Sequence, residues 1–436
     1  MKKIILLIFM TVFYCIQLEA QTFDWRPLPE GIKGTPLGST RVESMVALQD
    51  TNLMYVVGNF DTAGSLPCSG FAIWNGLNFS VLNGGPWITM SSYLNHIAAA
   101  GGTPPKLIYL VDNQSFTLIG QANSDIHCLI EYKGDLYAGG DFTDMDGVQC
   151  NNIARWDGTS WHPCGTGLTG PGGAQVFSLG VYNNKLYVGG AFEFAGGITS
   201  YNLAMWDSTN WQGIGIGTSQ SGDLVNAPVK EMGTFSNKLF ISGNFNEVNG
   251  LYTSQLAYTD GMGWFPTNFP SGSVTCIKEF NSKIYVSAFA YNVYNSTDGV
   301  NYSDVGLLFN SGPRSLEVFN DTLYVGGQFT MCGDTPCYRI ARLVQVPNDT
   351  TTINEMEISD LRVEIYPNPA NETLTLTAEN IKEIVVSNLL GEVVQSLKFK
   401  VQSSSATIDI SKLPQGIYLL RFQTNNGWRV GKVVKE

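Results

Sequence analysis

The chain has 436 residues, 14% of them charged, and a formal net charge of −12. This length suits a large domain followed by a smaller one, and the abundance of Gly, Asn, Ser and Thr is typical of a turn-rich exported β-protein. Residues 21–360 hold 14 Lys and Arg against 29 Asp and Glu, a net charge of −15. A domain with this charge repels phosphate backbones, so nucleic acid is not an expected partner.

Residues 1–20 have the pattern of a secretory signal peptide. Lys2 and Lys3 form the basic start, an apolar stretch covers 4–16, and Ala20 is the small residue before the expected cleavage point. The apolar stretch is too short for a comfortable membrane span, and no later stretch approaches the required length. We therefore expect no membrane span in the mature chain.

One phrase recurs along the next 325 or so residues. An apolar residue, an aromatic, an apolar residue, two small residues, any residue and Phe follow one another at 54–60, 136–142, 186–192, 239–245 and 323–329. Recurrence every 40 to 50 residues in strand-forming residue types is typical of a β-propeller. The paired glycines suit a strand whose backbone lies close to a neighbour or kinks.

The phrase is predicted to be the second strand of a four-stranded blade. The predicted innermost strands carry apolar residues three apart, at 42–45, 94–97, 126–129, 176–179, 229–232, 274–277 and 313–316. A third strand follows the phrase, clearest at 71–74, 152–156, 202–206 and 339–343, and an aromatic opens the fourth: Phe79, Trp161, Trp211 and Trp264. Large rings suit the layer between blades. Seven innermost strands predict seven blades over 21–346.

The last blade lacks a fourth strand of its own. Residues 23–31 resemble 160–167, where a fourth strand is expected, so the N-terminal strand is predicted to close the last blade. The repeats, over about 23–346, resemble those of kelch-related or similar secreted propellers. Propellers as a class support many functions, so this resemblance implies a fold only.

A polar, turn-prone segment at 347–360 is predicted to be a linker. Beyond it, 361–436 holds 9 Lys and Arg against 7 Asp and Glu, and its short alternating strands predict a small antiparallel β-sandwich. The fold class is therefore all-β, a seven-bladed propeller followed by this sandwich.

The C-terminal section carries an ordered set of short motifs. They are Tyr-Pro-Asn-Pro at 366–369, Leu-Leu-Gly ending at Gly391, Leu-Pro-Gln-Gly-Ile-Tyr at 413–418, and Lys-Val-Val-Lys at 432–435. In this order, at the end of a chain, they resemble the C-terminal sorting domain of type IX secretion cargo in Bacteroidota. The residues that carry the resemblance are Tyr366, Pro367, Asn368, Pro369, Gly391, Leu413, Pro414, Gly416, Tyr418, Lys432 and Lys435. The resemblance implies passage through the periplasm, recognition of the tail by the type IX machinery, and release or attachment at the cell surface after the tail is removed.

Seven cysteines follow the signal peptide, so at least one is unpaired or bridges to another chain. Cys332 and Cys337 flank a short turn-rich loop in a protein expected in an oxidising compartment, which predicts a local disulfide. Cys128 and Cys276 occupy matching positions on predicted innermost strands, and we expect them to be buried free thiols.

One segment is a candidate calcium site. Asp141, Asp144 and Asp146 precede Gly147, and hard oxygen ligands near a tight turn suit calcium. The equivalent loops of other repeats lack three acids, so a structural turn is the alternative. No other cofactor is expected.

Polar residues on the predicted innermost strands are the candidates for chemistry at the mouth of a central channel. His96 and His127 could join Glu43, Lys230, Glu231 or Arg314 in acid–base work, but solvated channel-lining groups are the alternative. Exposed aromatics are candidates for a glycan platform: Tyr201, Tyr252, Tyr291, Tyr294 and Tyr302. The sequence favours an extracellular binding protein for a glycan or protein, secreted or at the cell surface. The alternative is an extracellular hydrolase or lyase.

Overall fold

The computed structural model describes residues 22–28, 30–34, 40–82, 87–102, 106–112, 115–214, 227–248, 250–270, 272–289, 291–306, 308–346, 364–367, 369–388, 393–424 and 427–435. The signal peptide, the linker at 347–360, Asn368 and Gly391 lie outside these ranges. The chain divides into two compact units, 1–348 and 349–436. In the described ranges the ordered elements are β-strands and one short 3-10 turn, η2 (Gln49–Thr51), and no helix there is long and apolar enough to cross a membrane.

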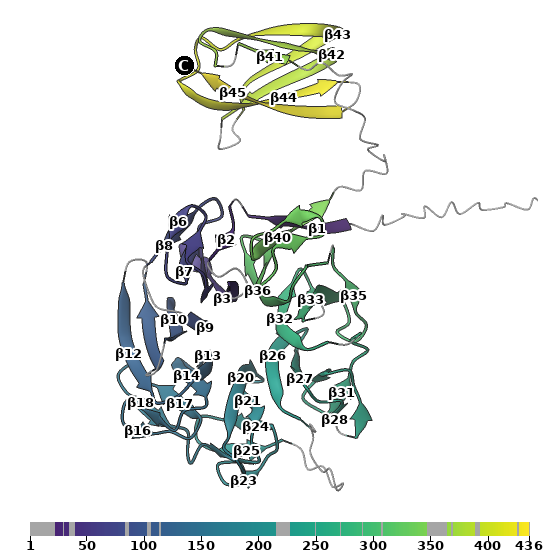
Figure 1. Ribbon diagram of the computed structural model, residues 1–436. Helices are drawn as coiled ribbons and strands as arrows, with labels where there is room; N and C mark the ends of the chain where they lie inside the picture. The colour runs from purple at the N-terminus through teal and green to yellow at the C-terminus, as the bar shows by residue number, and fades with distance from the viewer. Residues whose placement is uncertain are drawn as a thin grey trace, which may run out of the picture. The chain divides into compact units, whose positions relative to one another are not determined.

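Within the described part of the first unit, seven sheets each contain a path of four antiparallel strands (Figure 1). From the innermost strand outward, sheet 1 contains β3 (Arg41–Leu48), β4 (Leu53–Asn59), β7 (Phe71–Trp74) and β8 (Phe79–Val81), and sheet 2 contains β9 (Trp87–Tyr93), β10 (His96–Gly101), β11 (Lys106–Val111) and β12 (Phe116–Ala122). Sheet 3 contains β13 (Ile126–Tyr132), β14 (Asp135–Gly140), β17 (Ile153–Trp156) and β18 (Trp161–Pro163). Sheet 4 contains β20 (Gln175–Tyr182), β21 (Lys185–Ala191), β24 (Leu203–Trp206) and β25 (Trp211–Gly213).

Sheets 5 to 7 follow the same path. They are β26, β27, β30 and β31 (Val229–Phe235, Lys238–Gly243, Leu256–Thr259 and Trp264–Pro266); β32, β33, β34 and β35 (Val274–Phe280, Lys283–Ala288, Asn292–Ser296 and Ser303–Asp304); and β36, β37, β40 and β1 (Pro313–Phe319, Thr322–Gly327, Ile340–Val346 and Thr22–Pro27). Each innermost strand packs against the innermost strand of the next sheet, and β36 packs against β3, so the sheets form a closed ring. The prediction of a β-propeller is confirmed.

The innermost strand of sheet 2 differs from the prediction. Residues 94–97 were expected to be innermost, but β9 takes that place and His96 begins the second strand, β10. Leu94 and Asn95 form the turn between them, with φ of 44° and 62°. Two successive residues with positive φ are the signature of a tight hairpin turn, and a left-handed Leu is a poor sequence signal for one.

Small hairpins join the second and third strands on one face of the ring. They are β5–β6 (Thr62–Ala63, Leu66–Pro67), β15–β16 (Asp144–Met145, Val148–Gln149), β22–β23 (Phe194–Ala195, Ile198–Thr199), β28–β29 (Glu247–Val248, Leu251–Tyr252) and β38–β39 (Met331–Cys332, Thr335–Pro336). In sheets 2 and 6 the connections, 102–105 and 289–291, are too short to hold one. Because strands alternate in direction, the N-terminal ends of the innermost strands lie on this same face, which we call the bulge face.

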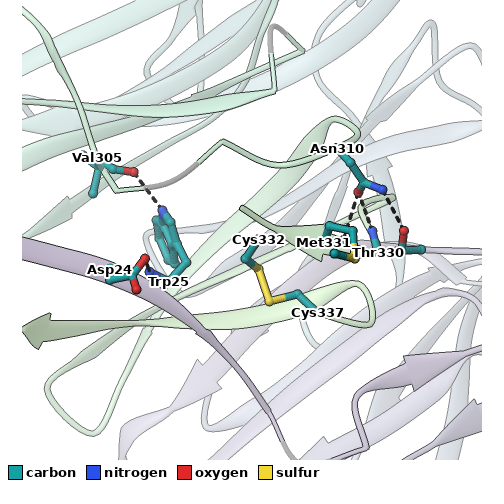
Figure 2. Close-up of a disulfide and its surroundings, with 8 residues drawn as sticks. All are labelled: Asp24, Trp25, Val305, Asn310, Thr330, Met331, Cys332 and Cys337. Atoms are coloured by element: carbon teal, nitrogen blue, oxygen red, sulfur yellow. Dashed lines mark hydrogen bonds between the residues drawn. A yellow bond between two sulfur atoms is a disulfide. The ribbon is translucent and has the colours of Figure 1, made fainter. Parts of the chain in front are cut away.

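The N-terminal segment holds the two ends of the ring together. β1 pairs with β40, with Trp25 opposite Leu343, and β2 (Ile32–Lys33) then pairs with β5 of sheet 1. Trp25 is 1% exposed, and its indole Nε1 donates a hydrogen bond to the Val305 carbonyl of the preceding sheet at 2.9 Å (Figure 2). Trp161 and Trp211 make the equivalent bond to the sheets before theirs, at 2.6 and 2.8 Å.

Sheet 7 also carries a covalent link. Cys332 and Cys337 are joined by a disulfide across the hairpin β38–β39, at the base of which Asn310 binds the backbone N–H groups of Thr330 and Met331 (Figure 2). Asn123 binds Thr143 and Asp144 in the same way in sheet 3. The other cysteines of the described residues, Cys68, Cys128, Cys150, Cys164 and Cys276, are free, and each is buried or half-buried.

The second unit is the predicted small β-sandwich, with longer strands than expected. Its strands are β41 (Glu364–Tyr366), β42 (Thr373–Ser387), β43 (Val393–Asp409), β44 (Gly416–Thr424) and β45 (Gly427–Lys435). They pair antiparallel in the order β41, β42, β44 and β45, with β43 also on β42. Leu374, Ile384, Ile408, Leu420 and Phe422 belong to its core.

We predict that Trp25 is required for stable ring closure. Trp25→Phe removes the donor to the buried Val305 carbonyl and should cost about 1–3 kcal/mol of unfolding free energy. Trp25→Ala also leaves a cavity and should cost about 3–5 kcal/mol. Urea unfolding of residues 21–436 measures both, with Tyr252→Phe as an exposed control expected within about 0.5 kcal/mol of the parent. An unchanged midpoint for Trp25→Ala would show that β1 is dispensable.

A second prediction concerns the cysteines. Alkylation without reductant should label five sites in denatured residues 21–436, and seven after reduction, because Cys332 and Cys337 are paired. In the native protein labelling should be slow, since burial raises the pKa of the Cys276 thiol to about 12 and the thiolate is the reactive form. Intact-mass analysis gives the counts. Seven labels in the unreduced denatured chain would refute the disulfide.

Candidate functional site

Each innermost strand begins with a β-bulge. Near the start of the strand the pairing register shifts across three consecutive residues, so the middle one has no partner on the neighbouring strand. In sheet 2 the shift lies between Ala100 and Gly101, which leaves Ile88 as the extra residue. Bulges re-aim side chains and are frequent next to functional sites. We call these seven residues the bulge ring: Glu43, Ile88, His127, Phe177, Lys230, Thr275 and Arg314.

The second glycine of the recurring phrase is a consequence of the bulge. A Cβ on Gly58, Gly140, Gly190 or Gly243 would lie 1.9–2.1 Å from the carbonyl oxygen of the residue two positions before the opposite bulge residue. No side chain tolerates that approach, so glycine is required there. The sequence feature that reveals the propeller is therefore also the feature that shapes its bulge face.

One part of the bulge ring is an ionic cluster across sheets 6, 7 and 1. The Glu43 carboxylate accepts from the Arg314 guanidinium at 3.2 Å and from Arg41, and both guanidinium side chains are about one-third exposed. The Arg314 guanidinium lies 5.3 Å from the centre of the Phe289 ring, in cation–π range. This cluster combines donors, an acceptor and an aromatic face.

His127 and Asp141 form the other pair. His127 Nε2 lies 2.8 Å from Asp141 Oδ1, and its ring centre is 5.5 Å from that of Phe177. Both side chains are about one-quarter exposed. The pair can exchange a proton with a bound molecule. His96, which was expected beside His127, begins a second strand instead and lies at the far end of its sheet.

The residue that follows the bulge residue lies deeper. Ser315 Oγ accepts the Met45 N–H at 3.1 Å, and Cys276 Sγ accepts the Leu316 N–H at 3.3 Å, so this position links neighbouring sheets. Glu231 stands at the same position, where burial raises the pKa of its carboxyl to about 8. Cys128 and Cys276 therefore have a structural role here.

The three aspartates of the calcium hypothesis serve different partners. Asp141 binds His127, Asp144 Oδ1 accepts the Gly147 N–H at 2.9 Å, and Asp146 Oδ1 accepts the Gln121 N–H at 2.9 Å. Across the described ranges no group of three or more His, Cys, Asp or Glu is arranged to hold a metal ion. The calcium hypothesis thus lacks a gathered ligand set, and the carboxylates shape the hairpin.

Ser160, His162 and Asp157 lie together on an exposed turn of the opposite face. His162 Nε2 is 2.7 Å from Asp157 Oδ2 and 3.1 Å from Ser160 Oγ. A catalytic triad needs the two partners on different ring nitrogens, whereas here both contact Nε2. The Thr159 hydroxyl and the backbone N–H groups of Ser160 and Thr159 also bind Asp157, and together they hold the pKa of its carboxyl well below the usual range. The cluster fixes the turn.

Two hollows occupy equivalent places at the outer edge of the ring. One, of about 360 Å³, lies beside Trp156 and Trp161, and the other, of about 260 Å³, lies beside Trp74 and Phe79. Both are formed by the aromatic pair of a third and fourth strand. Because their rings serve as packing between sheets, these hollows are weaker candidates than the bulge face.

The candidate tyrosines fall into two groups. Tyr294 is buried, and Tyr201 and Tyr302 are half-buried. Tyr252 and Tyr291 are 76% and 51% exposed, and both lie in connections on the bulge face. The structure therefore leaves two of the five available to a ligand.

In the second unit, separate parts of the sorting motif converge at one end of the sandwich. The Ala370 N–H, next to the Tyr366–Pro369 segment, donates to the Val434 carbonyl at 2.8 Å. Gly416 pairs with Lys435, and the Tyr418 hydroxyl donates to the Pro414 carbonyl at 2.8 Å. Tyr366, Pro367, Pro369 and Pro414 are exposed, Leu413 is half-buried, and Tyr418 is buried. Lys432 lies in β45, one residue from the buried Val433.

The two units differ in what known proteins they match. Residues 364–436 match the family described as the secretion system C-terminal sorting domain. No curated protein matches the chain. The family match therefore identifies the C-terminal unit only, and the propeller is compared with known proteins through its structure.

Solved structures of low identity share the propeller fold. The extracellular domain of the two-component system protein BT4673 from B. thetaiotaomicron matches with a TM-score of 0.55 and 10% identity, over 94% of this chain and 59% of that chain. A second structure of that domain gives 0.54 and 10%, over 96% and 59%. The WD40 β-propeller domain of Doa1 gives 0.45 and 14%, over 73% and 96%.

The chain spans about three-fifths of the BT4673 domain that it matches, and at this identity the likeness shows the fold alone. The C-terminal unit is more informative, because the description of its family states a role in secretion. The C-terminal unit of this chain is a type IX secretion sorting domain, which interacts with the secretion machinery and marks the β-propeller for the cell surface or the medium.

Proposed function

We propose that this protein is an exported seven-bladed propeller that binds an extracellular glycan or protein through its bulge face. The bulge ring carries the proposal. The residue before the bulge residue and the residue two after it are apolar in repeat after repeat, as in Val42 and Met45 or Val229 and Met232, because they pack between sheets. The bulge residues between them are instead Glu, Ile, His, Phe, Lys, Thr and Arg. Packing between the sheets explains the apolar residues on either side, but it does not explain which residue stands at each bulge position. A ligand that contacts the bulge ring would explain it.

The alternative is an extracellular hydrolase or lyase. It would use His127 and Asp141, the pair on the bulge face that can move a proton. Binding is favoured because Glu43 of the bulge ring and Asp141 beside His127 are each committed to a cationic or imidazole partner. A glycosidase would need two carboxyl groups facing one bond.

We also infer that the exposed motif residues of the sorting domain are read by the secretion machinery, and that the tail is removed within 347–360 after export. Tyr366, Pro367, Pro369 and Pro414 are exposed although they belong to the motif, so packing does not explain them. Tyr418 is buried and binds Pro414, which gives it a structural role.

Binding is tested with residues 21–436 on glycan and protein arrays. For a ligand found there, the double variant Ile88→Ala, Lys230→Ala should weaken binding at least about tenfold, or about 1.4 kcal/mol. Both side chains are exposed on the bulge face, so the fold should be kept. The matched control is Leu77→Ala, Met262→Ala, which removes exposed side chains from turns of the opposite face.

Loss of binding in the control alone would place the ligand on the opposite face and contradict the proposal. Conversion of the captured ligand separates the two functions. If the parent releases a product and His127→Gln abolishes release while capture persists, the protein is an enzyme.

Export is tested in a host that has the type IX machinery. Removal of 361–436 should leave a folded propeller in the periplasm, and 361–436 fused to a signal-bearing reporter should reach the surface or the medium. Tyr366→Ala should reduce export without loss of folding, whereas Val394→Ala, an equally exposed apolar residue on β43, should not. Export of the truncated protein at the parental level would contradict the assignment, and a full-length extracellular chain would contradict removal of the tail.

A further inference from the structure

The residue before each third strand is held at positive φ in six sheets. These residues are Gly70, Asn152, Asn202, Gln255, Tyr291 and Arg339, with φ between 62° and 75°. The conformation is unfavourable for side chains other than Gly and Asn. Where it is adopted, the rest of the structure must hold it in place.

In sheets 3 and 7 the side chain at this position is buried and donates hydrogen bonds to backbone carbonyls. Asn152 Nδ2 donates to the carbonyls of Gly140 and Ala174, at 3.1 and 2.6 Å. Arg339 is 2% exposed, and its Nε donates to the Thr40 carbonyl at 3.4 Å. Ala174 and Thr40 belong to the next sheet, so these side chains link neighbours beneath the hairpins.

Tyr291 departs from this pattern. Sheet 6 has no hairpin over its second and third strands, and Tyr291 is 51% exposed. Among the described residues it is the only aromatic at positive φ. A bulky residue in this conformation is strained, and with half of its surface exposed Tyr291 gains less from packing than Arg339 does; strain of this kind is characteristic of functional positions.

The surroundings of Tyr291 supply polar partners. Phe289, two residues earlier in the same connection, is 45% exposed, and the Arg314 guanidinium lies over its ring. Gly312 makes room for Phe289, since a Cβ there would lie 2.8 Å from the ring. The Arg314 Nε is buried and has no hydrogen-bond partner within the described residues, whereas the side chain as a whole is 29% exposed, so a ligand would reach the guanidinium through its terminal nitrogens.

We propose that Phe289, Tyr291, Arg314 and Glu43 form a binding site for a neutral saccharide. This rests on the proposed binding function and places the ligand on the bulge face at the short connection of sheet 6, where no hairpin separates the second and third strands. Sugar rings stack their C–H faces on aromatic rings, which two exposed rings in one connection provide. Sugar hydroxyls both donate and accept, and the Arg314–Glu43 pair offers one donor group and one acceptor group at 3.2 Å.

Charge favours a neutral ligand over an acidic one. Glu43 lies between Arg41 and Arg314, so the cluster of three carries a net charge of only +1. The region 21–360 around it carries −15 and repels a polyanion. A neutral saccharide meets no such barrier, and its affinity should change little with salt.

The test measures binding of neutral xylo-, manno- and gluco-oligosaccharides to residues 21–436 by calorimetry and by saturation-transfer NMR. Tyr291→Gly should weaken binding at least about tenfold and at the same time raise the thermal midpoint, because glycine relieves the backbone strain. Phe289→Ala should also weaken binding. Tyr252→Ala, which removes a more exposed tyrosine on the same face, should leave the affinity unchanged.

Three outcomes would overturn the saccharide site. They are the absence of neutral oligosaccharide binding, an affinity that Tyr291→Gly leaves intact, or selective binding of acidic oligosaccharides that weakens steeply with salt. A protein ligand that the Ile88→Ala, Lys230→Ala variant loses would keep the proposed binding function while overturning this site. The experiments therefore distinguish failure of the saccharide site alone from failure of the proposed binding function.

Discussion

A ring of sheets has two ends that must meet, and in this protein one N-terminal segment joins them. β1 supplies the fourth strand of sheet 7, Trp25 reaches the carbonyl of Val305 in sheet 6, and β2 pairs with the first hairpin of sheet 1. Three sheets thus share one short segment. The disulfide between Cys332 and Cys337 reinforces the same sheet. Without this closure, β40 would present an unpaired edge, and the bulge ring would lose its fixed spacing.

The propeller and the tail were predictable because each leaves a repeated or ordered physical signal. Glycine opposite a bulge is enforced by a contact near 2 Å in four sheets, so it recurs there, whereas Ala288 takes that place in sheet 6. The tail motifs come in a fixed order. Sheet 2 was misread for the opposite reason. Its second strand, His96–Gly101, has alanines where the phrase has Val and Gly, and its turn begins with Leu94. No side-chain signal marks that register.

The candidate site was harder to predict. His127, Glu43, Lys230 and Arg314 were visible as polar residues on innermost strands, but the sequence does not show that they occupy one bulge position. Tyr291 stood out only as one of five tyrosines in probable loops. Its backbone conformation, and the absence of a hairpin above it, depend on comparison between sheets in three dimensions. Positions that serve packing repeat, and positions that serve a ligand do not, so repeat-based reasoning is weakest at the site.

The pairing of Thr22 with Val346 sets an order of events during secretion. In a chain that is exported N-terminus first, β1 emerges first but has no partner until almost the whole propeller has followed. Long-range strand pairing of this kind is slow, and it exposes unpaired edges meanwhile. The sorting domain emerges last, after the linker that follows β40. In that order of export, its emergence coincides with the first moment at which the ring can close. A machinery that waits for the tail would receive cargo whose last sheet is already able to form.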